Sequence, residues 1–163
     1  MITCRPATEA DFPAIHRINR LCATTSCAGV YPADVIQSWA GPFLDWYYRE
    51  QNAAHQQEGV TLCAENQGEV VGVIRSLGTE IYMLFIDPAW QNRGIGKILL
   101  QALDRAVADK GLPPVSEVSS TPNAIAFYEQ SGFRKTGEKS RVALPGGLTL
   151  ELEKMQRGSF RSK

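Results

Sequence analysis

The sequence predicts a single α+β domain, and three observations carry that prediction. The chain has 163 residues, which is enough for one ordinary domain with its own apolar core. Short β-branched runs are interspersed with segments whose apolar residues recur every three to four positions. The order of these segments is β-α-α-β-β-β-α-β-α-β-β, which is typical of a mixed α+β fold.

The N-terminal part is predicted to form one strand and two helices. Residues 3–7 form a short strand, and residues 8–25 form a helix with Thr8 as its N-cap. A second helix begins near Pro32 and is ended by Gly41. The structure of the aromatic-rich segment that follows is left open.

Three consecutive strands come next. Residues 60–65 and 69–76 are β-branched runs separated by a turn at residues 66–68, which is a hairpin signal. A third run covers residues 80–87 and ends at Pro88. We expect these three strands to be consecutive and antiparallel.

The second half of the chain alternates between helices and strands. Apolar residues of the segment 95–107 fall on one helix face, and Gly111 ends that helix. Residues 115–120 then predict a strand, residues 121–132 a helix, and residues 133–155 a closing hairpin. We therefore place one domain at residues 1–156 and a loose tail at 157–163.

Composition excludes several classes of function. Seventeen basic residues balance seventeen acidic ones, so the chain lacks the positive field of a nucleic-acid-binding protein. No apolar run is long enough for a membrane span, and no basic leader precedes an apolar stretch at the start. We expect a cytoplasmic protein without nucleic-acid or membrane partners. The scattered cysteines and the two histidines favour reduced thiols over disulfides or a metal site: Cys4, Cys22, Cys27, Cys63, His16 and His55.

The loop "QNRGIGK", from Gln91 to Lys97, joins a predicted strand to a predicted helix. A Walker A loop would need glycine at Gln91 and Ser or Thr at Ile98, and a dinucleotide fingerprint would need glycine at Leu99. Both motifs are therefore absent. Two interpretations stay open at this point: a phosphate site at a helix N-terminus, or a simple turn from strand to helix.

The segment "QNRGIGKILL" resembles the acetyl-coenzyme-A loop, [QR]-x-x-G-x-[GA], of the GCN5-related N-acetyltransferase (GNAT) superfamily. The preceding "EIYMLFIDPAW" is similar to the fourth strand of that family, and "NAIAFYEQSGF" is similar to its "NA..FY...GF" segment. The resemblance implies the GNAT acyl-CoA N-acyltransferase fold. That fold has a mixed, mostly antiparallel sheet of six to seven strands flanked by about four helices.

The resemblance also implies the coenzyme site. The fourth strand would carry a bulge and splay from the fifth, leaving a slot in which main-chain groups pair with the pantetheine arm. Backbone N–H groups of the loop would hold the pyrophosphate, with cationic side chains nearby. The implied cofactor-binding residues are Leu84, Phe85, Ile86, Gln91, Asn92, Arg93, Gly94, Ile95, Gly96, Lys97, Asn123 and Tyr128.

Two residues are candidates for catalysis. Tyr128 occupies the family's tyrosine position, which implies a general acid that protonates the departing thiolate; the alternative is core packing beside Phe127. Glu80, at the start of the fourth strand, is where some members place a glutamate base. An ordinary glutamate is a weak base toward an alkylammonium, so Glu80 would need a pKa raised by burial, would act through water, or would only bind the cation. A solvated charge at a strand entrance is the alternative.

Other positions near the motifs carry weaker predictions. The oxyanion donor would be a main-chain N–H near Phe85. Asn123 is implied as a coenzyme contact, although Thr121 stands where the family more often has asparagine, and helix capping by Asn123 is the alternative. Asp87 is predicted to be a turn residue before Pro88.

The acceptor pocket of this superfamily is built by the first two helices and nearby loops, here residues 22–50. An aromatic cage for an ammonium is one interpretation of this segment, and helix packing or a homodimer surface is the other. The aromatic residues are Tyr31, Trp39, Trp46, Tyr47 and Tyr48, and the acidic ones are Asp34, Asp45 and Glu50.

The sequence thus predicts an acetyl-CoA-dependent N-acetyltransferase that moves an acetyl group to a primary amine by direct attack in a ternary complex. No cysteine falls in the motifs, and Cys63 is expected to be the only one near the sheet, which argues against an acetyl-cysteine. The alternative is a non-catalytic acyl-CoA sensor or interaction module on the same fold. The acceptor amine is not specified by the fold.

Overall fold

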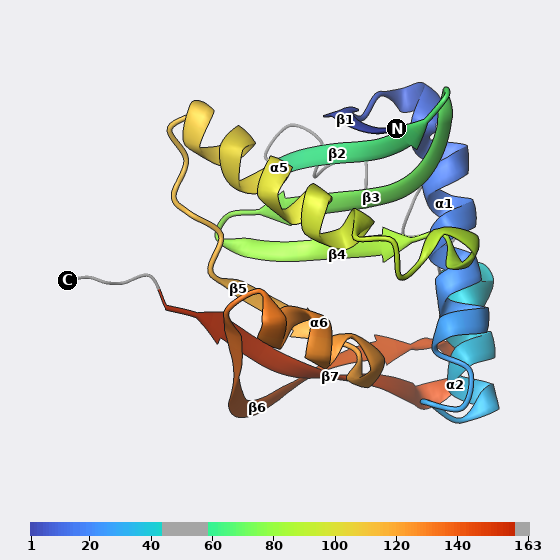
Figure 1. The fold of residues 1–163 in the computed structure, drawn as a ribbon. Helices are drawn as coiled ribbons and strands as arrows, with labels where there is room; N and C mark the ends of the chain where they lie inside the picture. Colours follow the sequence, from blue (N-terminus) through green and yellow to red (C-terminus); the bar gives the residue numbers. More distant parts are fainter. Residues whose placement is uncertain (44–58, 159–163) are drawn as a thin grey trace.

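The computed structural model describes residues 1–43 and 59–158, and these residues form a seven-stranded mixed sheet (Figure 1). The strand order is β1-β2-β3-β4-β5-β7-β6. β4 and β5 are parallel, and every other neighbouring pair is antiparallel. The α+β fold and the mostly antiparallel sheet are therefore confirmed. The strands are β1 (Ile2–Pro6), β2 (Gly59–Asn66), β3 (Glu69–Leu77), β4 (Glu80–Ile86), β5 (Glu117–Ser120), β6 (Phe133–Leu144) and β7 (Leu148–Arg157).

Four α-helices flank the sheet within the described residues: α1 (Phe12–Leu21), α2 (Ala33–Ser38), α5 (Ile95–Asp109) and α6 (Ile125–Gln130). A short turn, η1 (Glu9–Asp11), precedes α1, with Thr8 as its N-cap as predicted. The Thr8 N–H donates to the Asp11 carboxylate at 2.7 Å. Two π-helical turns, η2 (Cys22–Ser26) and η3 (Trp39–Phe43), extend α1 and α2.

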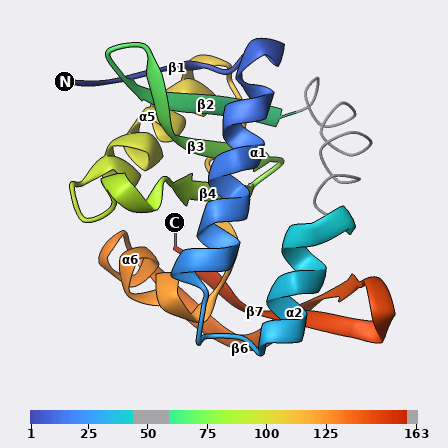
Figure 2. The same ribbon diagram turned by 90° about the vertical axis from the view of Figure 1, so that its right-hand side faces the viewer.

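The two faces of the β1–β4 half of the sheet are covered by different helices, α5 on one side and α1 on the other (Figure 1, Figure 2). Side chains alternate along a strand, so neighbouring residues of β2 enter different cores. Leu62 and Ala64 join the α5 core, whereas Cys63 between them packs with Ile15 and Ile18 of α1. The helix face predicted for residues 95–107 is buried as expected, with Leu99 and Leu103 fully inaccessible.

A third cluster packs η2 and α2 against the β6–β7 hairpin, on the lower part of Figure 2. Trp39 and Leu150 are among its buried members. Tyr31 contacts Trp39 edge to face at 6.5 Å between ring centroids, and its hydroxyl donates to the main-chain oxygen of Glu151 on β7. The segment between α1 and α2 is thereby attached to the C-terminal hairpin.

The central feature of the sheet is the separation of β4 from β5. Only two residue pairs join these strands, Glu80 with Glu117 and Ile81 with Val118. On the other edge of β4, the register to β3 shifts so that Tyr82 is the extra, bulged residue. Both the bulge and the splay implied for the fourth strand are therefore present.

The described chain extends slightly past the predicted domain boundary. β7 runs through Arg157, whose guanidinium pairs with Asp104 of α5 and donates to the main-chain oxygen of Val115. The rest of the predicted tail, residues 159–163, lies outside the described residues, and the boundary at residue 156 stays a prediction. None of the helices in the described part of the chain combines the length and apolar character needed to cross a bilayer.

Candidate functional site

A groove of about 870 Å³ lies where β4 has left β5, between the start of α5, α6 and η2. The splayed end of β4 forms its floor and the glycine loop one of its walls. Eleven of the twelve predicted cofactor-binding residues line it: Leu84, Phe85, Ile86, Gln91, Asn92, Gly94, Ile95, Gly96, Lys97, Asn123 and Tyr128. We call this cavity the donor groove. Arg93 is not among its lining residues, and its guanidinium lies over the Trp90 ring at 4.7 Å from the centroid.

The glycine loop opens the first turn of α5 toward the donor groove. Asn92 and Gly94 have φ values of +64° and +79°, and Gly94 is the N-cap of this 15-residue helix. A Cβ at Gly94 would meet no atom within 4 Å, so the space beside it is open to a ligand. Unpaired N–H groups and the positive end of a helix dipole suit a phosphate, and Lys97 adds a cation to the lining. These residues fit a pyrophosphate.

Gly96 lies in close contact with the Phe127 ring of α6. A Cβ there would lie 3.0 Å from Cε1 of Phe127 on α6. With a larger residue at position 96, the Phe127 ring would have to shift by a few tenths of an ångström. Both Gly96 and Phe127 line the donor groove.

The side chain of Gln91 connects the glycine loop to η2 and to the end of β4 by hydrogen bonds. Its Nε2 donates to Ser26 Oγ at 3.0 Å and to the main-chain oxygen of Ile86 at 3.1 Å. The same Ile86 oxygen accepts from Cys22 Sγ at 3.1 Å. The end of β4, the loop and η2 are thus held in one hydrogen-bonded unit.

The backbone of β4 presents alternate amides to the slot. Asp87 N–H donates to Val71 on β3, and the register pairs Phe85 with Val73. Hydrogen-bonded and non-hydrogen-bonded pairs alternate in an antiparallel ladder. The main-chain groups of Leu84 and Ile86 therefore face the slot, whereas those of Phe85 face β3. The predicted amide donor near Phe85 would therefore be the N–H of Leu84 or of Ile86, because that of Phe85 faces β3.

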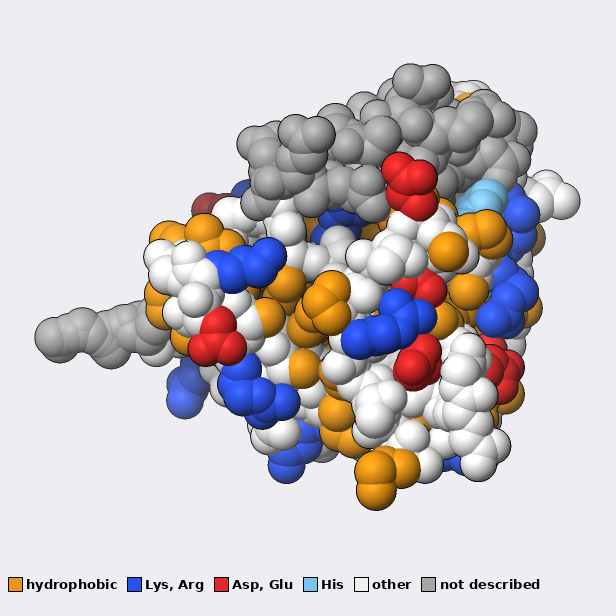
Figure 3. Space-filling view, turned by 90° about the horizontal axis from the view of Figure 1, so that it is seen from above, with side chains coloured by type: hydrophobic (Ala, Val, Ile, Leu, Met, Phe, Trp, Pro, Cys, Tyr) orange, Lys and Arg blue, Asp and Glu red, His pale blue; other side chains and the backbone are white. Residues whose placement is uncertain are grey.

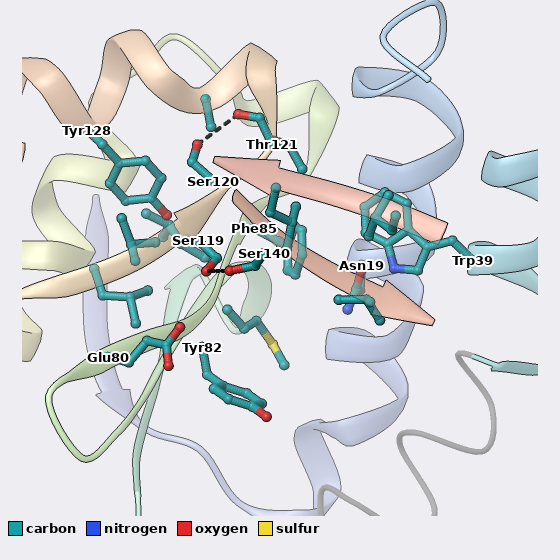
Figure 4. Close-up of a pocket in the computed structure, with 18 residues that line it drawn as sticks. Asn19, Trp39, Glu80, Tyr82, Phe85, Ser119, Ser120, Thr121, Tyr128 and Ser140 are labelled. Carbon is teal, nitrogen blue, oxygen red and sulfur yellow. Dashed lines mark hydrogen bonds between the residues drawn. The ribbon is translucent and has the colours of Figure 1, made fainter. Parts of the chain in front are cut away.

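A second cavity, of about 400 Å³, lies on the other side of the same strand end, and we call it the acceptor cavity (Figure 4). Its walls come mainly from β4, β5 and the β6–β7 hairpin. The helices and helical turns contribute Asn19 of α1, Trp39 of η3, Ala124 of η6 (Pro122–Ala124) and Tyr128 of α6. Five residues line both cavities: Leu84, Phe85, Thr121, Ala124 and Tyr128. The two cavities therefore meet at these residues.

Tyr128 lies at this junction, with 5% of its surface exposed. Its ring contacts Phe127 and Phe133 edge to face, at 5.2 and 5.5 Å between centroids. The Tyr128 side chain therefore both packs against its neighbours and lines the cavity. Figure 4 shows its hydroxyl pointing into the acceptor cavity. Burial raises the pKa of Tyr128 well above its usual range, so the hydroxyl keeps its proton at neutral pH.

Glu80 lines the acceptor cavity from the start of β4. Partial burial is the main cause that raises the pKa of its carboxyl, and the neighbouring Glu117 carboxylate raises it further. Lys154 and a hydrogen bond from Ser119 act in the opposite direction but do not cancel this shift. The sequence left open whether Glu80 is a base with a raised pKa or a solvated charge. Its partial burial in this cavity agrees with the raised pKa.

Several lining residues were not identified from the sequence. Ser119 and Ser140 approach to 2.9 Å between hydroxyl oxygens and lie in the acceptor cavity with Asn19 (Figure 4). They come from β5, β6 and α1, and none belongs to a recognisable motif. Only the pairing of strands distant in sequence brings them together.

Asn123 contacts residues at the end of η2, and Asp87 closes the turn after β4 and also pairs with Arg17 of α1 at 3.4 Å. The Asn123 amide donates to the Ser26 main-chain oxygen at 3.4 Å and accepts from Cys27 Sγ at 3.7 Å, while Thr121 is the N-cap of the turn that contains it. Asp87 is a turn residue as predicted: its carboxylate accepts from the Ala89 N–H at 2.9 Å.

The expectation that Cys63 is the only cysteine near the sheet is wrong. Cys4 lies in β1, and Cys22 and Cys27 line the donor groove. The π-helical turn after α1 brings these last two residues to the site. Burial raises the pKa of Cys22 to about 12 and raises that of Cys27, which leaves both thiols protonated at neutral pH.

The predicted aromatic cage is only partly located. Trp39 lines the acceptor cavity, but Tyr31 packs behind it, and Asp34 is exposed at the start of α2. The other members lie outside the described residues: Asp45, Trp46, Tyr47, Tyr48 and Glu50.

Charges on the face seen in Figure 3 are mixed, with basic and acidic side chains interspersed among hydrophobic ones. No continuous basic patch is visible on that face. The predicted absence of nucleic-acid partners is untested.

Comparison with known proteins identifies the domain. The family model described as an acetyltransferase (GNAT) domain matches residues 27–144. The mycothiol acetyltransferase of Nocardioides sp. is 38% identical over 65 residues, which are 39% of this chain and 22% of that protein. The chain spans about a fifth of the length of the mycothiol acetyltransferases that it matches.

Solved structures share the fold over nearly the whole chain. A GCN5-related N-acetyltransferase from Rhodopseudomonas palustris superposes with a TM-score of 0.80 at 23% identity, covering 96% of this chain and 95% of that one. The PaiA N-acetyltransferase from Thermoplasma acidophilum, solved with coenzyme A, gives a TM-score of 0.73 at 19% identity, covering 98% and 99%. At these identities the likeness shows the fold.

Proposed function

This chain belongs to the acetyltransferase (GNAT) domain family, and on that premise we propose that it transfers an acetyl group from acetyl-CoA to a primary amine by direct attack in a ternary complex. One observation carries the proposal: the donor groove and the acceptor cavity meet at Leu84, Phe85 and Tyr128. Two substrates held in these cavities would have their reacting groups at a common point.

The donor groove suits coenzyme A along its length. The first turn of α5, entered through Gly94, would hold the pyrophosphate. The slot-facing Leu84 carbonyl and Ile86 N–H would pair with the pantetheine amides, because the Ile86 carbonyl already accepts from Gln91 and Cys22. Bound acetyl-CoA supplies the acetyl thioester. The Leu84 N–H would donate to the thioester carbonyl oxygen, where negative charge develops during acyl transfer.

Glu80 is proposed to remove the proton of the amine through water. It precedes Leu84 by four residues on an extended strand, which corresponds to about 13 Å between Cα atoms. A glutamate side chain does not span that distance, so an ordered water between Glu80 and the amine is part of the proposal. The raised pKa of Glu80 improves its match to this task.

Tyr128 is proposed as the group that protonates the departing thiolate. Its raised pKa keeps the phenol protonated, but it also makes the phenol a weak acid in the free protein. The proton would therefore move in concert with cleavage of the carbon–sulfur bond, because a free tyrosinate would be costly in this apolar environment.

Direct attack is favoured over an acetyl-cysteine by the state of the two thiols in the donor groove. The thiolate is the nucleophilic form of cysteine, and burial raises the pKa of both Cys22 and Cys27. An acyl-CoA sensor would need only the donor groove. The adjoining cavity with an ionisable carboxyl favours an enzyme over that alternative.

The decisive experiment is a panel of amines with detection of the free coenzyme A thiol and mass spectrometry of the acceptor. Amine-dependent thiol release with an acetylated product supports the proposal. Binding of acetyl-CoA without release for every amine, peptide and protein lysine in the panel contradicts it. A cytoplasmic location, the absence of nucleic-acid and membrane partners, and a homodimer stay predictions.

A further inference from the structure

The described residues that line the acceptor cavity carry almost no charge. Among the described residues that line it, Glu80 is the only one with an acidic or basic side chain. Lys154, the cation that acts on Glu80, lies outside the lining, is exposed, and pairs with Glu138 at 3.6 Å. The formal charge that the described lining residues offer a ligand is therefore negative.

The other described lining residues are apolar or neutral. Trp39, Tyr82 and Phe85 contribute aromatic surface, and Val142, Leu150 and Leu152 contribute aliphatic surface from the C-terminal hairpin. The neutral polar groups are hydroxyls and one amide, among them the paired hydroxyls of Ser119 and Ser140.

From these observations, and resting on the proposed function, we infer that the acceptor is a small monoamine with an apolar body and no carboxylate or phosphate. A single ammonium would be attracted by Glu80, and the aromatic walls would cover a hydrocarbon or aryl body. A substrate carboxylate would lose its hydration beside Glu80 without gaining a cationic partner from the described lining residues. The cavity of about 400 Å³ has the size of a site for a small molecule.

The acceptor cavity would thus select among primary amines by the charge of the rest of the molecule. It disfavours free amino acids, which carry a carboxylate next to the amine. It also disfavours polyamines, whose second and third ammonium groups would enter an apolar cavity.

The test compares three acceptors that differ in one group: 2-phenylethylamine, L-phenylalanine and L-phenylalaninamide. The amide keeps the size of the amino acid but removes its negative charge. We expect 2-phenylethylamine and L-phenylalaninamide to be acetylated, with kcat/KM for L-phenylalanine lower by about 100-fold. An equal or higher kcat/KM for L-phenylalanine, or activity confined to polyamines or peptides, overturns the inference while leaving acetyl transfer in place.

A pair of variants gives a second, independent test. Val142 lines the acceptor cavity, whereas its neighbour Ala143 is exposed and points to the other face of β6. Val142→Lys should raise kcat/KM for L-phenylalanine relative to 2-phenylethylamine by about tenfold or more, because it supplies the missing cation. Ala143→Lys should leave that ratio unchanged. If both variants leave the ratio unchanged while folded, the assignment of charge selection to this cavity is wrong.

A failure of the proposed function is distinguishable from a failure of this inference. If no amine is acetylated, calorimetry on the protein loaded with coenzyme A still measures whether the cavity prefers an uncharged body over a carboxylate. Tighter binding of 2-phenylethylamine than of L-phenylalanine supports this selection, and the reverse order or equal binding contradicts it.

Discussion

Glu80 on β4 faces Glu117 on β5 as one of only two residue pairs that join these parallel strands. The pair stands where the sheet divides, and Glu80 alone of the two lines the acceptor cavity. The Glu117 carboxylate accepts from the Thr79 hydroxyl at 3.0 Å, which holds it beside its neighbour. This juxtaposition of like charges raises the pKa of the candidate base, in addition to the larger effect of burial.

The first prediction concerns the pH dependence of kcat/KM. If Glu80 is the base, activity falls as pH drops through its pKa, which defines an acid limb. Glu117→Gln removes a charge that raises this pKa, so the limb should move to lower pH. Lys154→Gln removes a charge that lowers it, so the limb should move to higher pH. Both shifts should shrink at high salt because these partners are exposed.

The control for that measurement is Glu80→Gln, which should lower kcat by about 100-fold and abolish the acid limb without weakening acetyl-CoA binding. An acid limb that survives in Glu80→Gln would assign the titration to another group.

The second prediction separates the chemistry of Tyr128 from its packing. Tyr128→Phe keeps the ring contacts with Phe127 and Phe133 but removes the hydroxyl. We expect kcat to fall by about 100-fold or more, with little change in the affinity for acetyl-CoA. The matched control is Tyr31→Phe, which loses the hydrogen bond to Glu151 and should cost about 1 kcal/mol of stability but leave kcat unchanged. Wild-type kcat in Tyr128→Phe would remove this residue from the mechanism.

The third prediction tests the glycine loop. Gly94→Ala places a methyl group beside the first turn of α5 at a φ of +79°, so it should weaken coenzyme A binding by at least about tenfold. Gly68 has a similar φ of +84° in the β2–β3 turn, remote from both cavities. Gly68→Ala therefore reports backbone strain alone, about 1 kcal/mol. Equal coenzyme affinity in the two variants, measured by calorimetry, would show that the loop does not bind the phosphate.

The fourth prediction addresses the thiols. Cys27→Ala should retain kcat within a factor of about three, because a buried thiol of raised pKa does not act as the acyl carrier. Cys63→Ala, in the core between β2 and α1, controls for loss of packing. An acetylated Cys27 or Cys22 in the intact protein, seen by mass spectrometry after incubation with acetyl-CoA alone, would contradict direct attack.

The fifth prediction concerns stability in acid. Arg5 forms two hydrogen bonds of 2.8 Å to the buried Asp11 carboxylate, and this lowers the pKa of Asp11 to about 2. Since the unfolded chain binds this proton more readily, the contribution is present above pH 4 and is lost as pH falls toward 2. After allowance for solvent around Arg5, it is about 1.5 kcal/mol. Asp11→Asn should lose that amount at neutral pH, measured by urea unfolding, but little at pH 2. A constant difference across this range would refute the assignment.

Much of the fold could be predicted from local patterns. The apolar face of α5, the turn at Gln67 and Gly68, and the glycine loop each depend on residues close in sequence. The loop and the "NAIAFYEQSGF" segment also indicated most of the donor groove, because both belong to continuous motifs. The motif does not reveal where the Arg93 side chain lies. In the structure its guanidinium stacks on Trp90, and the residue does not line the groove.

The acceptor cavity could not be predicted in the same way. Ser119 and Ser140 are neighbours only because β6 and β5 both flank β7 in the sheet. Cys22 and Cys27 reach the donor groove only because α1 continues into a π-helical turn, which has no sequence signature here. Features that depend on long-range pairing or on irregular backbone therefore required the structure.

Direct transfer requires both substrates to be bound together at the junction marked by Tyr128 and Leu84. Initial rates of thiol release, with acetyl-CoA and the amine varied against each other, test it most directly. For direct transfer we expect double-reciprocal lines that intersect, with one acetylated amine formed per coenzyme A released. Parallel lines, which indicate an acetylated enzyme intermediate, or release of coenzyme A that is independent of the amine, would contradict it.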